Sequence, residues 1–300
     1  MIIEHSLAKC HSIVKRLHLK RTYNWIVAMR IFSLVVLLFI SICTSAAENA
    51  TAVLDRQTAQ RPPQIDSARL KDFAARKIDT EDGPLQYREA FIDVQDGSSP
   101  ALVIYLHGSS GRGDDNLRQM RQQGIYAIQD YMEKHGIRGY LLVPQCPSDC
   151  RWQGYQRGKP CTGPVKHLVN LYLDKGLAER SRVYILGASM GGGGVWKLIN
   201  DMPGVFAAAL VASGDYRSGQ FQSLSSTPAY MTVGEEEGAE RVQNIRRLAK
   251  NIGDAGGEVR LVVLPGLDHK ETCVQSFSND DLAWVFKHQQ GPATFRECLP

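Results

Sequence analysis

One short segment of the sequence has the residue types and spacing of a catalytic nucleophile. Residues 187–191 read GASMG, with Ser189 at the centre, and they follow the apolar run Val183–Leu186. Between a strand and a helix, this G-x-S-x-G spacing predicts a sharp turn that exposes the serine hydroxyl. The two glycines are needed because a Cβ at either position would collide with neighbouring backbone. We expect Ser189 to attack a carbonyl carbon, and a plain glycine-rich turn is the alternative.

A nucleophilic serine requires a base, which in this strand–turn–helix arrangement follows the acid in chain order. His269 meets this requirement, because it follows the apolar run Val259–Leu264 in the segment GLDH. A surface or core histidine is the alternative. Three of the other histidines beyond the first 100 residues precede Ser189 and one lies in the last helical stretch: His107, His135, His167 and His288.

The acid that orients the imidazole is predicted in the loop after the apolar run Ala229–Val233. Glu237 lies in that loop, within a run of three glutamates. In the alternative, these acids form only a solvated helix start, where the helix dipole favours negative charge. Asp215, which follows another apolar run, and Asp268, adjacent to the predicted base, are the other candidates. Adjacent side chains seldom align for a direct hydrogen bond, which disfavours Asp268.

A second glycine-rich turn could stabilise an oxyanion. Residues 106–113 read LHGSSGRG and follow a predicted strand. The backbone N–H groups of Ser109 and Met190 form the predicted oxyanion hole, each donor contributing about 3 kcal/mol. A phosphate-binding loop is excluded, because it requires a lysine after its last glycine and none follows here. A dinucleotide-binding site is excluded as well, because the motif G-x-G-x-x-G does not follow the strand.

Three residues near these turns are candidate substrate contacts: Ser110, Trp152 and Tyr155. Trp152 and Tyr155 lie between Cys146 and Cys161 and could line a pocket for an acyl or aryl group. Ordinary packing beneath that loop is an equal alternative.

From about residue 80 onward, short apolar runs alternate with helical stretches. Continuous apolar runs predict strands covered by helices on both faces, whereas Tyr87–Val94 alternates as a half-buried edge strand does. The alternation predicts one α/β domain with a mostly parallel sheet. The runs are Ala101–Leu106, Tyr140–Val143, Val183–Leu186, Phe206–Ala212, Ala229–Val233 and Val259–Leu264, and the predicted helices are Asn116–Lys134, Pro164–Lys175, Met190–Met202, Ala239–Ala255 and Asp280–Gln289.

The basic charge of the chain belongs to its first 47 residues. They carry six Lys or Arg and one Glu, whereas the remaining residues carry 29 basic and 30 acidic groups. The uncharged run Ile31–Cys43 follows Arg30 and precedes small residues that end at Ala47, which is the layout of a cleaved secretory leader. A membrane span needs about 20 apolar residues, more than this run has. We expect export to the periplasm or the extracellular space; a membrane tether through an uncleaved leader is the alternative.

These features divide the chain into three parts. We assign residues 1–47 to the leader, 48–80 to a polar tether with at most a short helix, and 81–300 to one α/β catalytic domain. Met29 could itself open a leader of ordinary length, which makes residues 1–28 a candidate mis-assigned start. Composition and charge do not fit a disordered chain, a polytopic membrane protein or a nucleic-acid-binding protein.

Five cysteines follow the predicted leader, and export would expose them to oxidising conditions. Their spacing does not match a zinc site. Our working assignment pairs Cys150 with Cys161 and Cys273 with Cys298, and leaves Cys146 as a buried free thiol. Spacing alone does not decide the connectivity.

Several of these segments together resemble the α/β-hydrolase esterases. They are LHGSSGRGDDN at 106–116, VPQCP at 143–147 followed by Trp152, RVYILGASMGGGGVW at 182–196, and LPGLDH at 264–269. More narrowly, they look like the secreted predicted-peptidase or dienelactone-hydrolase-like branch, whose members resemble feruloyl and acetyl-xylan esterases and polyhydroxybutyrate depolymerases. The family usually has Asp at the acid position, where this chain has Glu237.

The resemblance implies a serine esterase mechanism without a cofactor or metal. It carries the nucleophile onto Ser189, the base onto His269 and the oxyanion donors onto Ser109 and Met190. We expect hydrolysis of a small-molecule or polysaccharide-linked carboxylic ester. Acyl transfer or peptide hydrolysis by the same triad is an alternative, as is a non-catalytic binding protein on a hydrolase scaffold.

Overall fold

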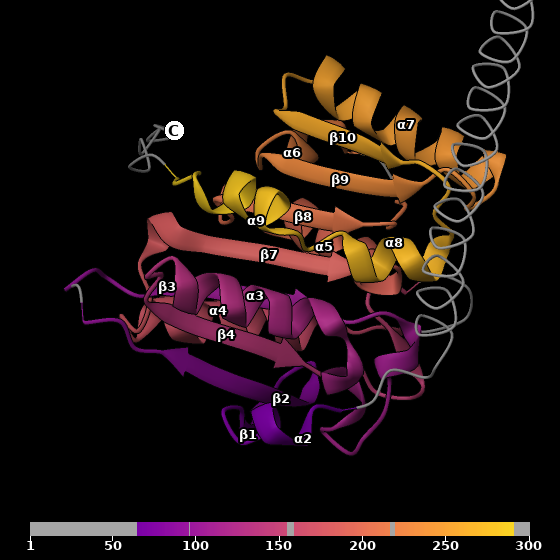
Figure 1. Ribbon diagram of the computed structural model, residues 1–300. Helices are drawn as coiled ribbons and strands as arrows, with labels where there is room; N and C mark the ends of the chain where they lie inside the picture. Colours follow the sequence, from indigo (N-terminus) through magenta and orange to yellow (C-terminus); the bar gives the residue numbers. More distant parts are fainter. Residues whose placement is uncertain (1–64, 96, 155–158, 217–219, 291–300) are drawn as a thin grey trace, which may run out of the picture. The chain divides into compact units, whose positions relative to one another are not determined.

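A sheet of eight strands forms the centre of the computed structural model, which describes residues 65–95, 97–154, 159–216 and 220–290 (Figure 1). The strand order is β1-β2-β4-β3-β7-β8-β9-β10. β2 runs antiparallel to β1 and β4, and the other neighbouring pairs of this sheet are parallel. The strands are β1 (Ala74–Thr80), β2 (Gly83–Ile92), β3 (Ala101–Leu106), β4 (Gly139–Pro144), β7 (Val183–Ala188), β8 (Ala208–Ala212), β9 (Ala229–Gly234) and β10 (Val259–Leu264).

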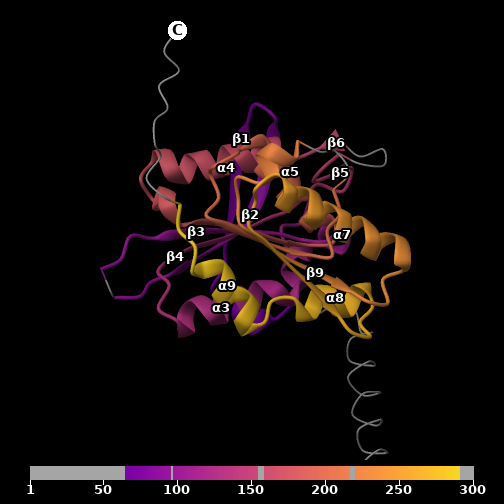
Figure 2. The same cartoon turned by 90° about the horizontal axis from the view of Figure 1, so that it is seen from above.

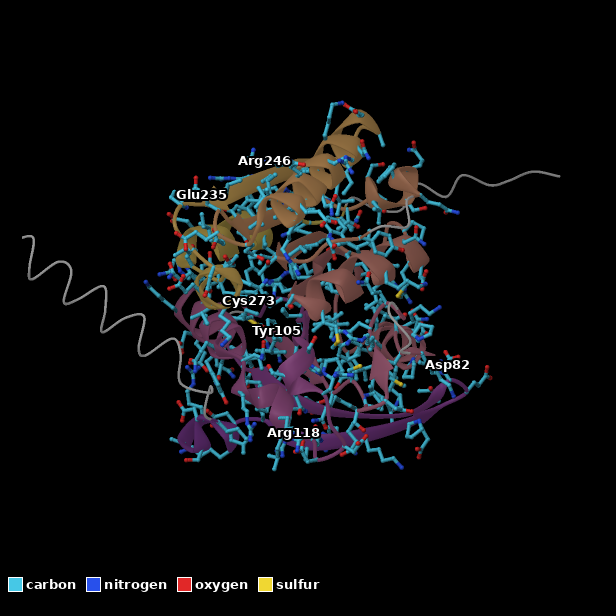
Figure 3. All side chains as sticks on the ribbon, turned by 90° about the vertical axis from the view of Figure 1, so that its right-hand side faces the viewer. Asp82, Tyr105, Arg118, Glu235, Arg246 and Cys273 are labelled. Carbon is cyan, nitrogen blue, oxygen red and sulfur yellow. The ribbon has the colours of Figure 1, made fainter. Side chains whose placement is uncertain are left out.

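The sheet confirms the predicted mostly parallel α/β architecture. Every residue of β3, β7, β8 and β9 is buried, as expected for parallel strands covered on both faces. The carboxyl ends of these strands meet at one edge of the sheet, which Figure 3 views head-on. In open α/β sheets, ligand-binding residues gather at that edge.

Helices cover both faces of the sheet (Figure 2). Leu102 and Ile104 of β3 share one buried cluster with α4, α5 and α7, whereas Val103 and Tyr105 share a second cluster with α3 and α9. This alternation follows from the two-residue period of a strand. The helices are α2 (Ser67–Leu70), α3 (Gln123–Lys134), α4 (Gly163–Asp174), α5 (Met190–Asp201), α6 (Phe221–Leu224), α7 (Ala239–Asp254), α8 (His269–Gln275) and α9 (Asn279–Phe286).

The domain begins earlier than the sequence predicted. β1 lies inside the stretch 48–80 that we assigned to a tether, and it pairs with β2 along its whole length. No residue of β1 is buried, so the strand lacks the apolar pattern by which the other strands were recognised.

Three helical assignments also differ from the prediction: the start of α3, and the short helices α6 and α8, which the sequence did not predict. The helix predicted to start at Asn116 begins at Gln123 and is preceded by a short 3-10 turn at Arg118–Arg121. Asn116 itself has a φ of 51°, outside the helical region, and its side-chain amide donates to the Tyr87 carbonyl. The sequence did not predict α8, whose seven residues include one buried side chain, Thr272.

Several sequence predictions fall outside the described residues. These are the leader at 1–47 with the candidate start at 29, most of the tether, Tyr155 and Cys298. In the part of the chain that the structure describes, no helix has the length and apolar character needed to cross a membrane.

α5 approaches the sheet through glycine. A Cβ on Gly191 would lie 1.8 Å from the Leu106 carbonyl oxygen of β3, and one on Gly187 would lie 2.7 Å from the Gly191 backbone. No side chain fits at these distances, so the absence of a Cβ is what allows helix and strand to touch backbone to backbone. This contact fixes where α5 starts relative to the end of β7.

Gly191→Ala should destabilise the domain by about 1–3 kcal/mol or more, because the added methyl group forces α5 away from β3. Gly253→Ala in α7 is the matched control, since no neighbouring heavy atom lies within 4 Å of its Cβ position. The control should be neutral or should stabilise by up to about 1 kcal/mol. Urea unfolding followed by circular dichroism measures both, and equal stability of the two variants would contradict the close contact.

Candidate active site

Ser189 forms the turn between β7 and α5. Its φ of 55° and ψ of −116° are a combination that residues with a Cβ rarely adopt. Its N–H donates to the Ala212 carbonyl of β8 at 2.8 Å, and α5 begins at the next residue. The strained turn predicted from the G-x-S-x-G spacing is therefore present at the carboxyl edge of the sheet.

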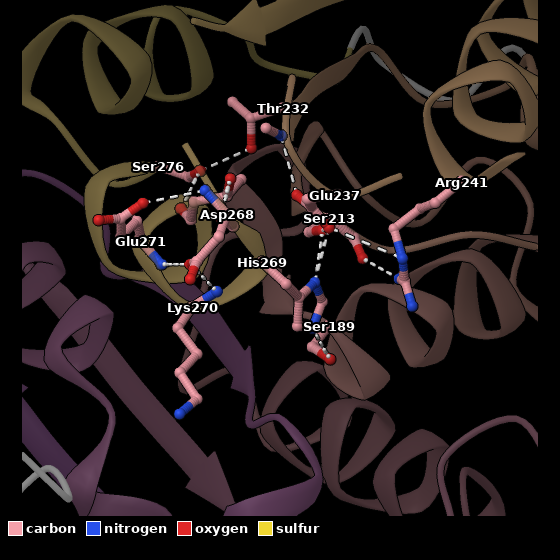
Figure 4. Close-up of polar contacts among 12 residues, drawn as sticks. Ser189, Ser213, Thr232, Glu237, Arg241, Asp268, His269, Lys270, Glu271 and Ser276 are labelled. Carbon is pink, nitrogen blue, oxygen red and sulfur yellow. Dashed lines mark hydrogen bonds and ion pairs between the residues drawn. The ribbon is translucent and has the colours of Figure 1, made fainter. Parts of the chain in front are cut away.

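His269 reaches Ser189 from the loop after β10. Its Nε2 lies 2.8 Å from Ser189 Oγ (Figure 4). His269 is the first residue of α8, and Asp268 caps that helix by accepting the N–H groups of Lys270 and Glu271. The backbone of α8 thus engages the Asp268 carboxylate, which excludes this candidate as the direct partner of the imidazole.

Glu237 is the carboxylate that meets the imidazole. Its Oε2 lies 2.6 Å from His269 Nδ1, and its Oε1 accepts the N–H of Gly234 at 2.8 Å. The side chain has no exposed surface. Burial alone would raise the pKa of this carboxyl, but hydrogen bonds from His269, Ser213 and Gly234 outweigh it and lower the pKa to about 2. Because Glu237 is an anion at neutral pH, it holds the proton of the imidazole on Nδ1 and leaves Nε2 free to accept the Ser189 proton.

Ser213 is a contact that the sequence prediction missed. It follows β8 with a φ of 54° and is completely buried. Its hydroxyl donates to Glu237 Oε2 and lies 2.9 Å from His269 Nδ1. The prediction considered only Asp215, two residues further along, because a charged side chain is easier to single out than a hydroxyl. The signal that could have identified Ser213 is its position directly after β8, a predicted strand whose carboxyl end lies next to that of β7.

The guanidinium of Arg241 lies next to the Glu237 carboxylate. Arg241, in the first turn of α7, has its Nε 3.7 Å from Glu237 Oε2, and its Nη1 donates to the Ser213 carbonyl at 3.3 Å. Figure 4 shows the guanidinium beside Glu237, where it approaches the same carboxylate oxygen that His269 contacts. A positive charge at this position favours a carboxylate that burial would otherwise penalise.

The predicted oxyanion turn lies beside the nucleophile. A Cβ on Gly108 would lie 3.5 Å from Ser189 Cβ. The preceding residue, His107, is completely buried, and this burial lowers its pKa to about 4, so the ring is neutral. Its Nε2 accepts the N–H of Cys146 at 3.0 Å, and its Nδ1 lies 2.6 Å from the Gly108 carbonyl, to which it donates. The His107 ring therefore links the turn at Gly108 to Cys146 and holds it in place.

Two backbone N–H groups near Ser189 are placed as the predicted donors require. Met190 is the first residue of α5, and the first N–H groups of a helix have no partner within it. The helix dipole also favours negative charge at this end. Ser109 opens the short helical turn Ser109–Gly111, directly after Gly108. Their role as oxyanion donors stays a prediction that this placement favours.

The three candidate substrate contacts have different environments. Ser110 is exposed and accepts a hydrogen bond from Gln122 Nε2 at 3.2 Å. Trp152 is completely buried, and its Nε1–H donates to the His107 carbonyl at 3.0 Å. Its ring therefore packs under the oxyanion turn and offers no surface to a substrate. Tyr155 lies outside the described residues.

The four consecutive glycines of α5 each face a different neighbour. A Cβ at any of the four would come within 3 Å of a heavy atom, so the run brings the start of the helix into close contact with three other segments. These contacts are Gly191 with Leu106 at 1.8 Å, Gly192 with Gly214 at 2.8 Å, Gly193 with Gln153 at 2.6 Å and Gly194 with Trp152 at 2.6 Å.

These groups can move one proton from a hydroxyl to an imidazole and stabilise the resulting charge. Ser189, His269 and Glu237 form an unbroken chain of hydrogen bonds that ends on a buried anion. Among the described residues, no group of three or more His, Cys, Asp or Glu side chains is arranged to hold a metal ion. The chemistry that the arrangement supports is nucleophilic attack by Ser189.

Solved structures with the same fold include esterases. No protein-family model matches the chain, and a search of curated proteins found no match. A thermostable esterase is 26% identical with a TM-score of 0.66, over 73% of this chain and 64% of that one, so this chain spans just under two thirds of its length. A mutant of the feruloyl esterase module from Clostridium thermocellum, complexed with sinapinate, is 14% identical with a TM-score of 0.54, over 73% and 89%. A puromycin-hydrolyzing peptidase from Mycobacterium tuberculosis is 17% identical with a TM-score of 0.55, over 72% and 40%.

The chain thus has an esterase-like α/β-hydrolase fold, as the resemblance implied. Its Ser–His–Glu contacts lie at the sheet edge where that fold gathers its functional residues.

The buried anion predicts how stability depends on pH. The folded state lowers the pKa of Glu237 from 4.5 to about 2, so the unfolded chain binds more protons between these pH values. The stabilisation from ionised Glu237 is complete above about pH 4.5 and is lost as the pH falls towards 2. Glu237→Gln should therefore show a shallower loss of unfolding free energy than the unsubstituted protein over this range.

Urea unfolding at pH 5, 4 and 3 measures this slope. Glu236→Gln is the control, because its side chain is exposed in the same loop, and it should keep the original slope. An unchanged slope in Glu237→Gln would contradict a lowered pKa at this position.

Proposed function

We propose that the protein is a serine hydrolase that cleaves carboxylic esters through an acyl-enzyme on Ser189. The observation that carries the proposal is the chain of hydrogen bonds from Ser189 Oγ through His269 to the buried Glu237. The esterase-like fold supports it, because this chain of contacts lies at the turn where that fold places its nucleophile.

In the first half of the reaction, His269 Nε2 takes the Ser189 proton as Oγ attacks the ester carbonyl carbon. The carbonyl oxygen becomes an oxyanion, which the N–H groups of Ser109 and Met190 stabilise. The tetrahedral intermediate then collapses, the bond to the alcohol breaks, and His269 returns the proton to the departing alcohol oxygen. Glu237 keeps the imidazole oriented and favours its charged form.

In the second half, water replaces the alcohol. His269 removes a proton from the water, which attacks the acyl-enzyme carbonyl to form a second tetrahedral intermediate. As this intermediate collapses, the bond from the carbonyl carbon to Ser189 Oγ breaks, His269 returns the proton to Oγ, and the carboxylic acid leaves. Each step uses the same base and the same oxyanion donors.

The proposed substrates are small-molecule or polysaccharide-linked esters, including esters of aromatic acids. Two solved structures of the same fold are a ferulic acid esterase and the mutant feruloyl esterase module complexed with sinapinate. The substrate side of the proposal rests on this likeness and on the sequence resemblance, and a panel of acetyl, butyryl, long-chain and feruloyl esters tests it.

We further propose that the protein is exported. The support is the apolar run Ile31–Cys43, with basic residues before it and small residues after it. Cell fractionation, with N-terminal sequencing of the mature protein, tests export and cleavage after Ala47.

Ser189→Ala should reduce hydrolysis of a p-nitrophenyl acyl ester by about 10⁴-fold or more, because among the described residues Ser189 supplies the hydroxyl that contacts His269 Nε2. The variant should also lose labelling by a fluorophosphonate probe. Ser223→Ala in α6 is the matched control and should keep both. Undiminished turnover by a folded Ser189→Ala protein would refute the proposal, and an unlabelled parent protein would favour a non-catalytic scaffold.

The acceptor of the acyl group distinguishes hydrolysis from transfer. With an added alcohol or sugar acceptor, the free carboxylic acid should remain the main product, because water is the proposed acceptor. Chromatography of the products measures the ratio, and a dominant new ester would instead identify an acyltransferase. Release of an amine from an amino-acid amide, at a rate above that of matched esters, would indicate a peptidase.

A further inference from the structure

Two thiols lie against each other close to the active site. Cys146 Sγ and Cys161 Sγ are 3.0 Å apart, and Cys146 is completely buried while Cys161 is 6% exposed. No disulfide links the four described cysteines, which include Cys150 and Cys273. The hydrogen bond with Cys146 and the burial both raise the pKa of the Cys161 thiol, so this side chain is not poised to act as a thiolate nucleophile.

The backbone brings the two cysteines together. β5 (Cys150–Arg151) pairs with β6 (Lys159–Pro160), and the Cys161 N–H donates to the Arg151 carbonyl at 3.2 Å. These backbone contacts place Cys161 beside Arg151, in the segment that follows Cys146, and so favour the proximity of the two sulfurs.

Cys146 is also bonded to the oxyanion turn. Its N–H donates to His107 Nε2 at 3.0 Å, and its carbonyl accepts the N–H of Gly113 at 3.1 Å. Trp152, between the two cysteines, donates to the His107 carbonyl and packs against Gly194 of α5. One stretch of chain thus supports both the oxyanion turn and the helix that begins after Ser189.

We propose that Cys146 and Cys161 form a disulfide that holds this stretch against the oxyanion turn and keeps the turn in its catalytic geometry. The bond itself rests on the contacts above, whereas its effect on turnover rests on the proposed function. The pair replaces our working assignment of Cys150 with Cys161. Cys150, whose partly exposed thiol is also within hydrogen-bonding reach of Cys161, then stays reduced.

The reaction needs an external disulfide as oxidant, either a small-molecule disulfide or a thiol–disulfide oxidoreductase. The two cysteine thiols lose two electrons and two protons and form one S–S bond. The S–S bond of the oxidant breaks, takes up the electrons and protons, and leaves as two thiols. Because both sulfurs are buried in the folded domain, the oxidant reaches them while the chain folds.

Peptide mapping tests the bond directly. The full chain is refolded in a glutathione redox buffer, alkylated without reduction and digested with trypsin. We expect peptides 139–151 and 158–166 to be cross-linked, with fragment ions that separate Cys146 from Cys150 placing the bond on Cys146. The cross-link should persist in Cys150→Ser. Alkylation of both Cys146 and Cys161 without reduction, or a bond from Cys150 to Cys161, would overturn the proposal.

Stability and turnover test the consequence. Refolding in a phosphine reductant should lower the Tm by roughly 6–12 °C, because the loop between Cys146 and Cys161 is then no longer closed by a disulfide and the unfolded chain gains entropy. It should also lower kcat on a p-nitrophenyl ester by roughly three- to tenfold, because the oxyanion turn loses its anchor. Cys150→Ser should respond in the same way, whereas Cys161→Ser should no longer respond to the reductant.

These readouts separate the two proposals. A cross-linked protein with equal kcat in its oxidised and reduced forms would overturn the link between the disulfide and the oxyanion turn. A cross-linked, stabilised protein without any esterase activity would leave the disulfide established and would refute only the proposed hydrolase function.

Discussion

The strained backbone of Ser189 is the constraint on which the rest of the site depends. A residue with a Cβ at a φ of 55° costs of order 1–3 kcal/mol, and it persists only where the surrounding structure leaves it no alternative. Here the N–H of Ser189 is bonded to β8, and α5 directly after it is in backbone contact with β3 through Gly191. The packing of a whole helix therefore sets the position of one hydroxyl.

The same strain recurs on the neighbouring strand. β7 and β8 are each followed directly by a serine with positive φ, and the two hydroxyls lie on opposite nitrogens of one imidazole. Ser189 Oγ is next to His269 Nε2, and Ser213 Oγ is next to Nδ1 together with Glu237. Hydrogen bonds at both nitrogens thus limit the rotation of the ring: Ser189 acts at Nε2, and Ser213 and Glu237 act at Nδ1.

How much of this could be predicted from the sequence depends on how local each feature is. Continuous apolar runs identified the central strands, and the glycine spacing identified the turn at Ser189, because both signals lie within a few residues. β1 was not predicted, because an edge strand without buried residues has no alternation of apolar and polar side chains. Ser213 and the Cys146–Cys161 contact escaped notice because they depend on which loops meet in space, and a hydroxyl or a thiol carries no charge that would mark its position.

The polar side chains of β1 also affect how the edge of the sheet can interact with other molecules. β1 forms one edge of the sheet, and its outer backbone groups could template the addition of a strand from another molecule. Arg76, Lys77 and Asp79 place charges along that edge, and Arg76 is paired with Glu89 of β2. Bringing a foreign strand alongside would require these charges to lose water. β1 is thus suited to preventing edge-to-edge aggregation of these molecules at high concentration.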